Sequence, residues 1–153
     1  ALSSEAAASP THAWSDSPGG NYANGANTAL TSPTWDLTGL ENVTLSWRQI
    51  YDLEATYDFG RVEISTNGGG SWSQLLSFDG EGHDTFWESV EIALPALDGA
   101  AQARLRFRLT SDTSQVFDGW HIDDVLLSAT SPNLVFADGF DLSGTGRWSG
   151  VFP

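Results

Sequence analysis

Hydrophobic and polar residues alternate with a period of two along most of the chain. The clearest run is 104–109, where leucine and phenylalanine alternate with three arginines. Shorter runs with the same alternation cover 43–48, 61–65 and 89–94. Successive side chains of a β-strand point to opposite faces, so each run predicts a strand with one buried face.

Turn-forming clusters separate these runs. Glycine, proline, asparagine and aspartate gather at 17–20, 67–70, 79–82 and 98–99. No stretch has the periodicity of an amphipathic helix. The pattern predicts an all-β protein, an antiparallel two-sheet sandwich in which each strand buries one face.

One predicted strand breaks its own alternation. Trp120 and Ile122 share a face, whereas Val125 and Leu127 are one residue out of phase with them. An extra residue at 123–124 would restore the phase, so we predict a β-bulge there with all four apolar side chains facing the core. The bulge holds two adjacent aspartates, which repel each other unless a positive charge lies beside them or water solvates them.

The length fits one domain with a short tail. A chain of 153 residues can bury about two-thirds of its unfolded surface. We place the sandwich domain at 1–130. After a Ser-Pro break, we expect the aromatic, glycine-rich segment 131–153 to add strands or to dock as a tail.

Composition indicates a secreted bacterial protein. The chain has no Cys, which excludes disulfides and thiolate zinc sites, and it has neither Met nor Lys. Without an initiating Met, we expect it to begin inside a longer precursor with any signal peptide upstream. No run approaches the ~20 apolar residues of a membrane-spanning helix.

Charge argues against several partners. The chain has 20 acidic and 6 basic residues, for a formal net charge of -14. Nucleic acid and anionic membrane surfaces would be repelled, so we expect no nucleic-acid partner and no membrane insertion. Clustered carboxylates suit the capture of cations instead.

Sequence motifs for catalysis are missing. The chain has no nucleophile elbow, P-loop, His-Glu-x-x-His pair or nucleotide fingerprint. We interpret its histidines, His12, His83 and His121, as surface residues, and no pair of carboxylates stands out as a glycosidase pair. We therefore predict no catalytic residue.

Acidic residues concentrate in two predicted loops and at the bulge. Asp52, Glu54 and Asp58 lie in the first loop, and Asp112 and Asp118 flank the second. Calcium takes about six to eight oxygen ligands, and irregular loops add backbone carbonyls to the carboxylates. This density predicts a bound calcium ion where the two loops meet at one end of the sandwich. A solvated acidic rim is the alternative.

Seven tryptophans raise the question of sugar binding. Trp47 and Trp120 lie on apolar strand faces and are expected in the core. Trp14, Trp87 and Trp148 are the candidates for a stacking platform, with simple packing as the alternative. An exposed row of tryptophans on one sheet face would favour sugar binding, whereas buried tryptophans would favour an accessory role.

Several motifs together resemble one family. They are Ser-Pro-Thr-His-Ala-Trp at 9–14, Tyr-Asp-Leu-Glu at 51–54, Phe-Asp-Gly-Trp at 117–120 and Ile-Asp-Asp-Val at 122–125. They resemble the MAM-like jelly-roll domains of secreted bacterial peptidases of the immune inhibitor A type, and more distantly the calcium-containing jelly-roll carbohydrate-binding modules. The resemblance implies a jelly-roll sandwich with a structural calcium ion. The family's carboxylate positions fall on Asp52, Glu54, Asp58, Asp118, Asp123 and Asp124.

We therefore expect a non-catalytic, calcium-binding accessory domain of a secreted bacterial hydrolase, with a peptidase as first choice. Such a domain would stabilise the parent protein or hold it near its substrate surface. Its partners would be the catalytic domain of the same precursor and cell-surface or extracellular polymers. A carbohydrate-binding module and an adhesin or interaction domain are the alternatives.

Overall fold

The computed structural model describes residues 1–3, 7–9, 12–82 and 86–132. Apart from its first two residues, the predicted C-terminal segment lies outside this part of the chain, and so does Trp148. Within it, no helix has the length and apolar character needed to cross a membrane.

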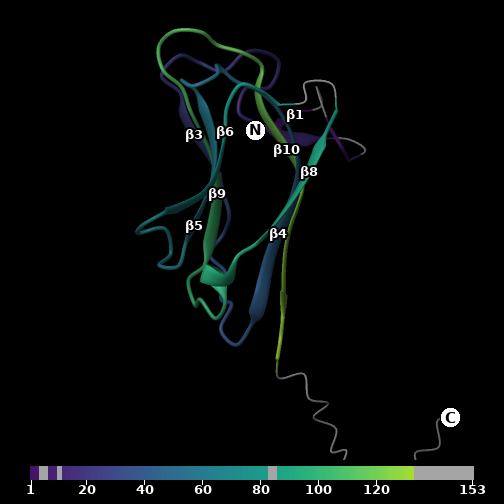
Figure 1. Cartoon of the computed structure of the whole chain (residues 1–153), viewed down its shortest axis with the longest axis vertical. Coiled ribbons are helices and arrows are strands. Elements are labelled where there is room, and N and C mark those ends of the chain that lie inside the picture. Colours follow the sequence, from purple (N-terminus) through teal and green to yellow (C-terminus); the bar gives the residue numbers. More distant parts are fainter. Residues whose placement is uncertain (4–6, 10–11, 83–85, 133–153) are drawn as a thin grey trace, which may run out of the picture.

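Two antiparallel sheets face each other across the core (Figure 1). The larger sheet runs in the order β1-β2-β10-β4-β7, with β8 also paired to β4; its strands are β1 Leu2–Ser3, β2 Ala13–Ser15, β10 Gly119–Thr130, β4 Glu41–Asp52, β7 Glu81–Gly82 and β8 Glu88–Ala93. The smaller sheet runs in the order β3-β9-β5-β6; its strands are β3 Asn27–Thr31, β9 Arg104–Thr110, β5 Phe59–Ser65 and β6 Ser73–Phe78. A short 3-10 helix, η1, spans Pro95–Leu97. The prediction of an all-β, antiparallel two-sheet jelly-roll sandwich is confirmed.

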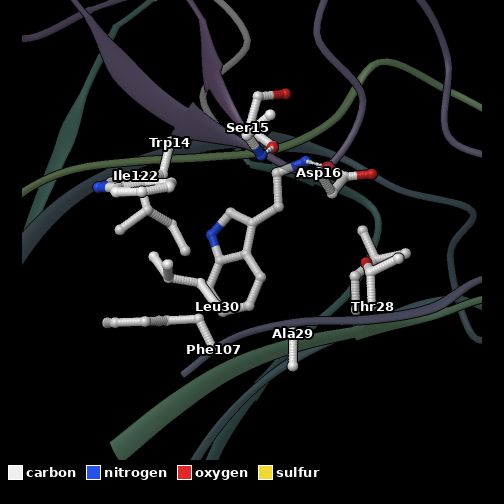
Figure 2. A pocket seen from close by; sticks show the side chains of 11 residues that line it. Trp14, Ser15, Asp16, Thr28, Ala29, Leu30, Phe107 and Ile122 are labelled. Carbon is white, nitrogen blue, oxygen red and sulfur yellow. Dashed lines mark hydrogen bonds between the residues drawn. The ribbon is translucent and has the colours of Figure 1, made fainter. Parts of the chain in front are cut away.

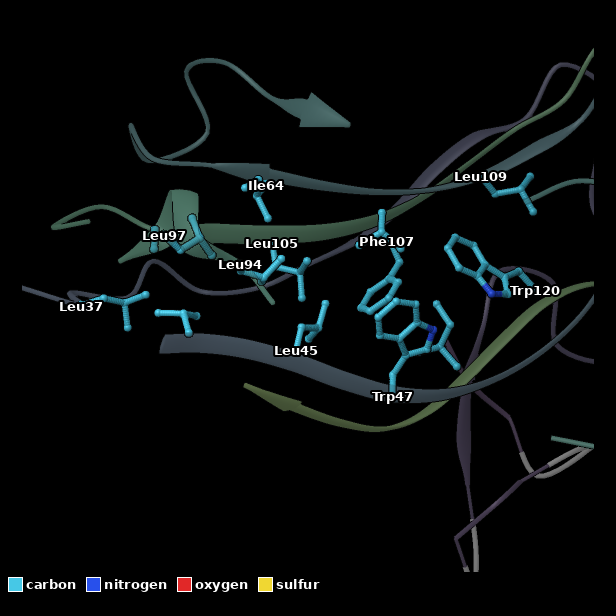
Figure 3. Packing of buried hydrophobic residues seen from close by; sticks show 14 of the residues in the cluster. Leu37, Leu45, Trp47, Ile64, Leu94, Leu97, Leu105, Phe107, Leu109 and Trp120 are labelled. Atoms are coloured by element: carbon cyan, nitrogen blue, oxygen red, sulfur yellow. The ribbon is translucent and has the colours of Figure 1, made fainter. Parts of the chain in front are cut away.

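Aromatic rings from both sheets meet in the core (Figure 3). The Phe107 ring of β9 lies 5.5 Å from that of Trp47 on β4 and 5.6 Å from that of Trp120 on β10, both in edge-on geometry. Edge-on pairs add to the stabilisation that burial alone provides. The prediction that Trp47 and Trp120 belong to the core is confirmed.

The predicted bulge in β10 is confirmed. Asp123 pairs with Arg48 of β4, and the next pair is Leu126 with Ser46, so three steps along β10 match two along β4. Asp124, inside the bulge, has a φ of 51°. One extra residue is thus inserted where the alternation breaks.

Burial after the bulge follows the prediction only in part. Leu127 packs against the core as predicted. Val125, also predicted to face the core, is 41% exposed. The prediction for Val125 is wrong because this residue lies within the bulge itself, between the last pair before it and the first pair after it, where strand alternation does not hold.

Gly119 allows β10 to begin close to Asp16. Its φ is 103°, and a Cβ there would lie 2.4 Å from Asp16 Oδ1, the atom that accepts a hydrogen bond from the Trp120 backbone N–H. We expect Gly119→Ala to destabilise the fold by about 1–3 kcal/mol in thermal unfolding. Gly99→Ala is the control, since Gly99 also has a positive φ but open space around it. Equal losses in both variants would contradict the steric argument.

Candidate functional site

Three carboxylates meet where the loop before β5 approaches the loop after β9. Glu54, Asp58 and Asp112 each place an oxygen within 4.8 Å of the others. Glu54 is 8% exposed and Asp58 is fully buried. Two of the three charges are therefore held away from water.

A single turn of the backbone brings Glu54 and Asp58 together. The Asp58 N–H donates to the Glu54 carbonyl at 3.0 Å, the i to i+4 bond of one helical turn, and Thr56 between them has a φ of 70°. The turn is not a helix, because Thr56 is left-handed, but it closes with the Glu54 and Asp58 carboxylate oxygens within 4.8 Å of each other. The spacing of these two carboxylates thus places both in one site.

Tyr22 links the two carboxylate-bearing residues from the core side. Its hydroxyl donates to Asp58 Oδ2 at 2.5 Å and accepts a hydrogen bond from the Glu54 backbone N–H at 3.1 Å. Burial and the hydrogen bond to Asp58 raise the pKa of the Tyr22 hydroxyl. The phenol therefore keeps its proton at neutral pH and remains a donor to Asp58.

The loop after β9 supplies further donors, all of them neutral. Ser114 Oγ lies 2.8 Å from both Glu54 Oε2 and Asp112 Oδ1, and Gln115 Nε2 donates to Glu54 Oε1 at 3.0 Å. The Asp112 backbone N–H donates to Asp58 Oδ1 at 2.8 Å. These bonds orient the carboxylates but leave their charge uncompensated.

The carboxylate cluster has no basic partner in the described part of the chain, where the ion pairs are Arg106–Glu63 and His121–Asp118. Buried like charges repel each other, and a buried carboxylate without a counter-charge is costly. A hard cation with oxygen ligands would offset both costs. An all-oxygen donor set fits calcium better than zinc, which prefers nitrogen and sulfur.

The six predicted ligands do not all gather at this cluster. Glu54 and Asp58 belong to it, together with Asp112, which the predicted ligand set lacks. Asp118 is not a member; its side chain is 54% exposed and its Oδ2 lies 3.0 Å from the His121 Nε2. His121, predicted to be on the surface, is 1% exposed, because Ser15 of β2 and Ile50 of β4 lie beside it in the sheet and Asp118 contacts its ring.

The other predicted ligands lie along β10 and β4. Asp52 ends β4, opposite Gly119, so the two acidic loops do leave the sheet side by side. Asp124 is exposed within the bulge. Asp123 accepts hydrogen bonds from the backbone N–H groups of Ser9 at 2.7 Å and Ala8 at 2.9 Å. Burial opposes its ionisation, but these bonds, together with those from the Asp124 N–H and the Ser9 hydroxyl, outweigh burial and lower the pKa of Asp123.

Knowledge of which strands pair would have identified Asp112 as a member of the cluster. Phe59 lies opposite Thr110 in the antiparallel register of β5 and β9. The residue before Phe59 is therefore close to the residues that follow Thr110, which places Asp58 near Asp112. The signal lies in which two strands pair, and alternation alone does not carry that information.

A cavity of about 280 Å³ lies between the sheets beside the first strands (Figure 2). Its walls include Trp14, Leu30, Phe107 and Ile122, so it is mostly apolar. Among the tryptophans that the structure describes, Trp14 alone is exposed, at 43%. Trp87 is half-buried, so no exposed row of tryptophans crosses either sheet in the described residues.

Asp16, at the edge of this cavity, makes stability depend on pH. Burial raises the pKa of Asp16 above its ordinary 3.8, against the hydrogen bond from Trp120. The fold therefore favours the protonated form, and stability is lost as pH rises from 3.8 through the raised pKa. We expect Asp16→Asn, which keeps an acceptor for Trp120, to be more stable than wild type at neutral pH, with the difference vanishing at acid pH.

Asp36→Asn is the matched control for this prediction in denaturant unfolding between about pH 3 and 7. Hydrogen bonds from Thr38 lower the pKa of the exposed Asp36. Its carboxylate therefore adds stability above the unfolded-state pKa, and Asp36→Asn should lose stability at neutral pH. Shifts of the same sign in both variants would contradict the assignment for Asp16.

The fold and the carboxylate cluster define an antiparallel jelly-roll sandwich with a candidate calcium site. No protein-family model matches the chain. It is a distant homologue of part of Bacillopeptidase F from Bacillus subtilis (strain 168), with 35% identity over 112 residues, which is 73% of this chain and 8% of that protein.

Two solved structures are similar to this chain at low sequence identity. The Family 16 Carbohydrate Binding Module-2 has a TM-score of 0.52 and 14% identity, and the match covers 83% of each chain. A structure of TmCBM61 with beta-1,4-galactotriose has a TM-score of 0.48 and 12% identity, over 81% of this chain and 74% of that one. At such identity the first likeness shows the jelly-roll fold alone.

Proposed function

We propose that this chain is a non-catalytic, calcium-binding accessory domain of a secreted bacterial peptidase, of the MAM-like jelly-roll type. The homology to Bacillopeptidase F carries the proposal, because the match covers 73% of this chain and only 8% of that protein. Such a ratio is typical of a module attached to a longer protein. The domain stabilises its parent or holds it near a substrate surface, in contact with the catalytic domain of the same precursor.

The surroundings of the histidines support a non-catalytic role. His121 is buried and lies against Asp118, and His12 is exposed on the N-terminal segment. His83 lies outside the described residues. No hydrogen bond joins a histidine to a serine hydroxyl in the described part of the chain, so the pairing that activates a serine nucleophile is missing there.

The carboxylate cluster supports the calcium part of the proposal. Glu54, Asp58 and Asp112 would hold the ion, and Tyr22 and Ser114 would orient their carboxylates. An ion bound there would join the loop 53–58 to the loop 111–118 and thereby fix one end of the sandwich. Its role would be structural. The other predicted ligands are candidates outside this cluster, and the Asp118→Asn variant below tests Asp118.

Calcium titration by calorimetry tests the site. We expect one site in the chelator-treated chain and clearly weaker binding in Asp112→Asn, because a carboxylate ligand is lost. Asp118→Asn should bind as wild type does. The reverse pattern would place the ion at the ligands predicted from sequence, and no binding would contradict the calcium proposal. Hydrolysis of casein by the purified chain would contradict the non-catalytic role.

A further inference from the structure

Four of the five arginines in the described part of the chain lie on the outer face of the smaller sheet. Strand β9 carries Arg104, Arg106 and Arg108, and β5 carries Arg61. The residues between them face the core, so these four side chains point outward. We call this surface the arginine face. The fifth, Arg48, is on β4 in the other sheet.

The arginine face carries a net positive charge in a strongly acidic chain. Glu63 is the one acidic residue in the four strands of the smaller sheet, and it forms an ion pair with Arg106 at 2.6 Å. Arg61 lies directly opposite Arg108 in the register of β5 and β9. Like charges directly opposite each other destabilise a sheet. An anion bound between the two guanidinium groups would offset this repulsion.

The other three arginines are held by neutral acceptors. Arg108 Nε donates to Asn27 Oδ1 at 2.8 Å, and Arg61 donates to the Thr110 hydroxyl. Arg104 donates to backbone carbonyls. These bonds fix the guanidinium groups in place and leave their charges available to a ligand.

Aromatic rings support two of the guanidinium groups. Arg61 stacks over the Phe59 ring at 4.7 Å, and Arg106 stacks over the Trp72 ring at 4.2 Å. Side chains held in this way lose little freedom when a ligand binds. A planar guanidinium also binds a carboxylate through two parallel hydrogen bonds. The face is therefore organised for carboxylates before any ligand arrives.

The position of β9 in its sheet limits what kind of polymer can bind. Its backbone pairs with β3 on one side along 106–110 and with β5 on the other along 104–110. A peptide cannot add to it as an extra strand, so recognition depends on side chains alone. Alternate side chains repeat at about 6.8 Å along a strand, so the row from Arg104 to Arg108 extends over about 14 Å.

We propose that the arginine face binds an acidic polysaccharide, a polymer of uronic acids. Its carboxylates would pair with the guanidinium groups of Arg61 and Arg108, and its hydroxyl groups suit Asn27 and Thr110 beside them. The net charge of the chain repels polyanions at long range, but charges beyond ~8 Å are largely screened at physiological salt. This inference rests on the proposed accessory role and not on the calcium site. The polymer would be the surface to which the domain holds its parent protein.

Calorimetric titration of the 153-residue chain with a hexamer of galacturonic acid tests the proposal. We expect binding that weakens as salt is added, and a loss of about tenfold or more in affinity for Arg61→Gln/Arg108→Gln. Arg48→Gln, which removes one positive charge from the other sheet as Arg61→Gln does from this one, should bind as wild type does. If the double variant does not fold, Arg61→Gln alone serves, with a smaller expected loss.

Several outcomes would overturn the proposal. These are no binding by wild type, unchanged binding by the arginine variants, and equal binding of the methyl-esterified hexamer, which has no charge. Equal binding of hexaglutamate or of a single-stranded DNA hexamer would replace the polysaccharide with another polyanion. Calcium binding and casein hydrolysis by the same proteins keep the two failures distinct. A chain that binds calcium normally and does not hydrolyse casein, but does not bind the hexamer, refutes the arginine face alone.

Discussion

Removing calcium is expected to lower the melting temperature of this chain by about 5–10 °C. A ligand bound only by the folded state adds about 2.7 kcal/mol at a hundredfold excess over its Kd. Without the ion, Glu54, Asp58 and Asp112 face one another with oxygens within 4.8 Å, and their repulsion adds to the loss. Thermal unfolding with calcium and with chelator, at one ionic strength, measures the difference.

Asp112→Asn is expected to remove most of this sensitivity to chelator. The variant loses a ligand, so it gains less from calcium, and it loses one repelling charge, so its metal-free form should be at least as stable as metal-free wild type. Asp118→Asn, outside the cluster, should respond to chelator as wild type does. A wild type that melts alike in both buffers and holds no calcium by elemental analysis would leave the acidic loops as a solvated rim.

Alternation predicted the strands well because a strand with one buried face needs an apolar side chain at every second position. Strand β9 buries Leu105, Phe107 and Leu109 between the sheets, as its period of two requires. The bulge in β10 was predictable for the same reason, since a one-residue shift in phase has to be absorbed at one point. These features depend on local sequence only.

The site was harder to predict because its members meet through strand pairing and loop conformation. Acidic density singled out the two loops that carry the carboxylate cluster, but Asp112 rather than Asp118 faces Glu54 because β5 and β9 pair with Phe59 opposite Thr110. Asp123 shows the same limit. Its partner is the backbone of Ser9, 114 positions away in the sequence, and no periodicity relates the two.

Gln49→Met is expected to destabilise the fold by roughly 2–5 kcal/mol. Gln49 is fully buried, and its Oε1 accepts hydrogen bonds from the indole N–H groups of Trp47 at 2.9 Å and Trp120 at 3.1 Å. Its Nε2 donates to Glu88 Oε2 at 3.0 Å. Methionine has a similar length and shape but a thioether that accepts only weakly, so packing is kept while two buried donors lose their partner.

The size of this loss decides whether the core depends on polar pairing as well as on packing. Each buried N–H without an acceptor costs about 1–3 kcal/mol, more than the net gain from making one hydrogen bond. Gln74→Met on β6 is the matched control, since Gln74 is exposed and its change should stay within about 0.5 kcal/mol. Denaturant unfolding followed by tryptophan fluorescence measures both. A loss below about 1 kcal/mol in Gln49→Met would mean that the two indoles find other acceptors, and that the placement of Trp47 and Trp120 does not depend on Gln49.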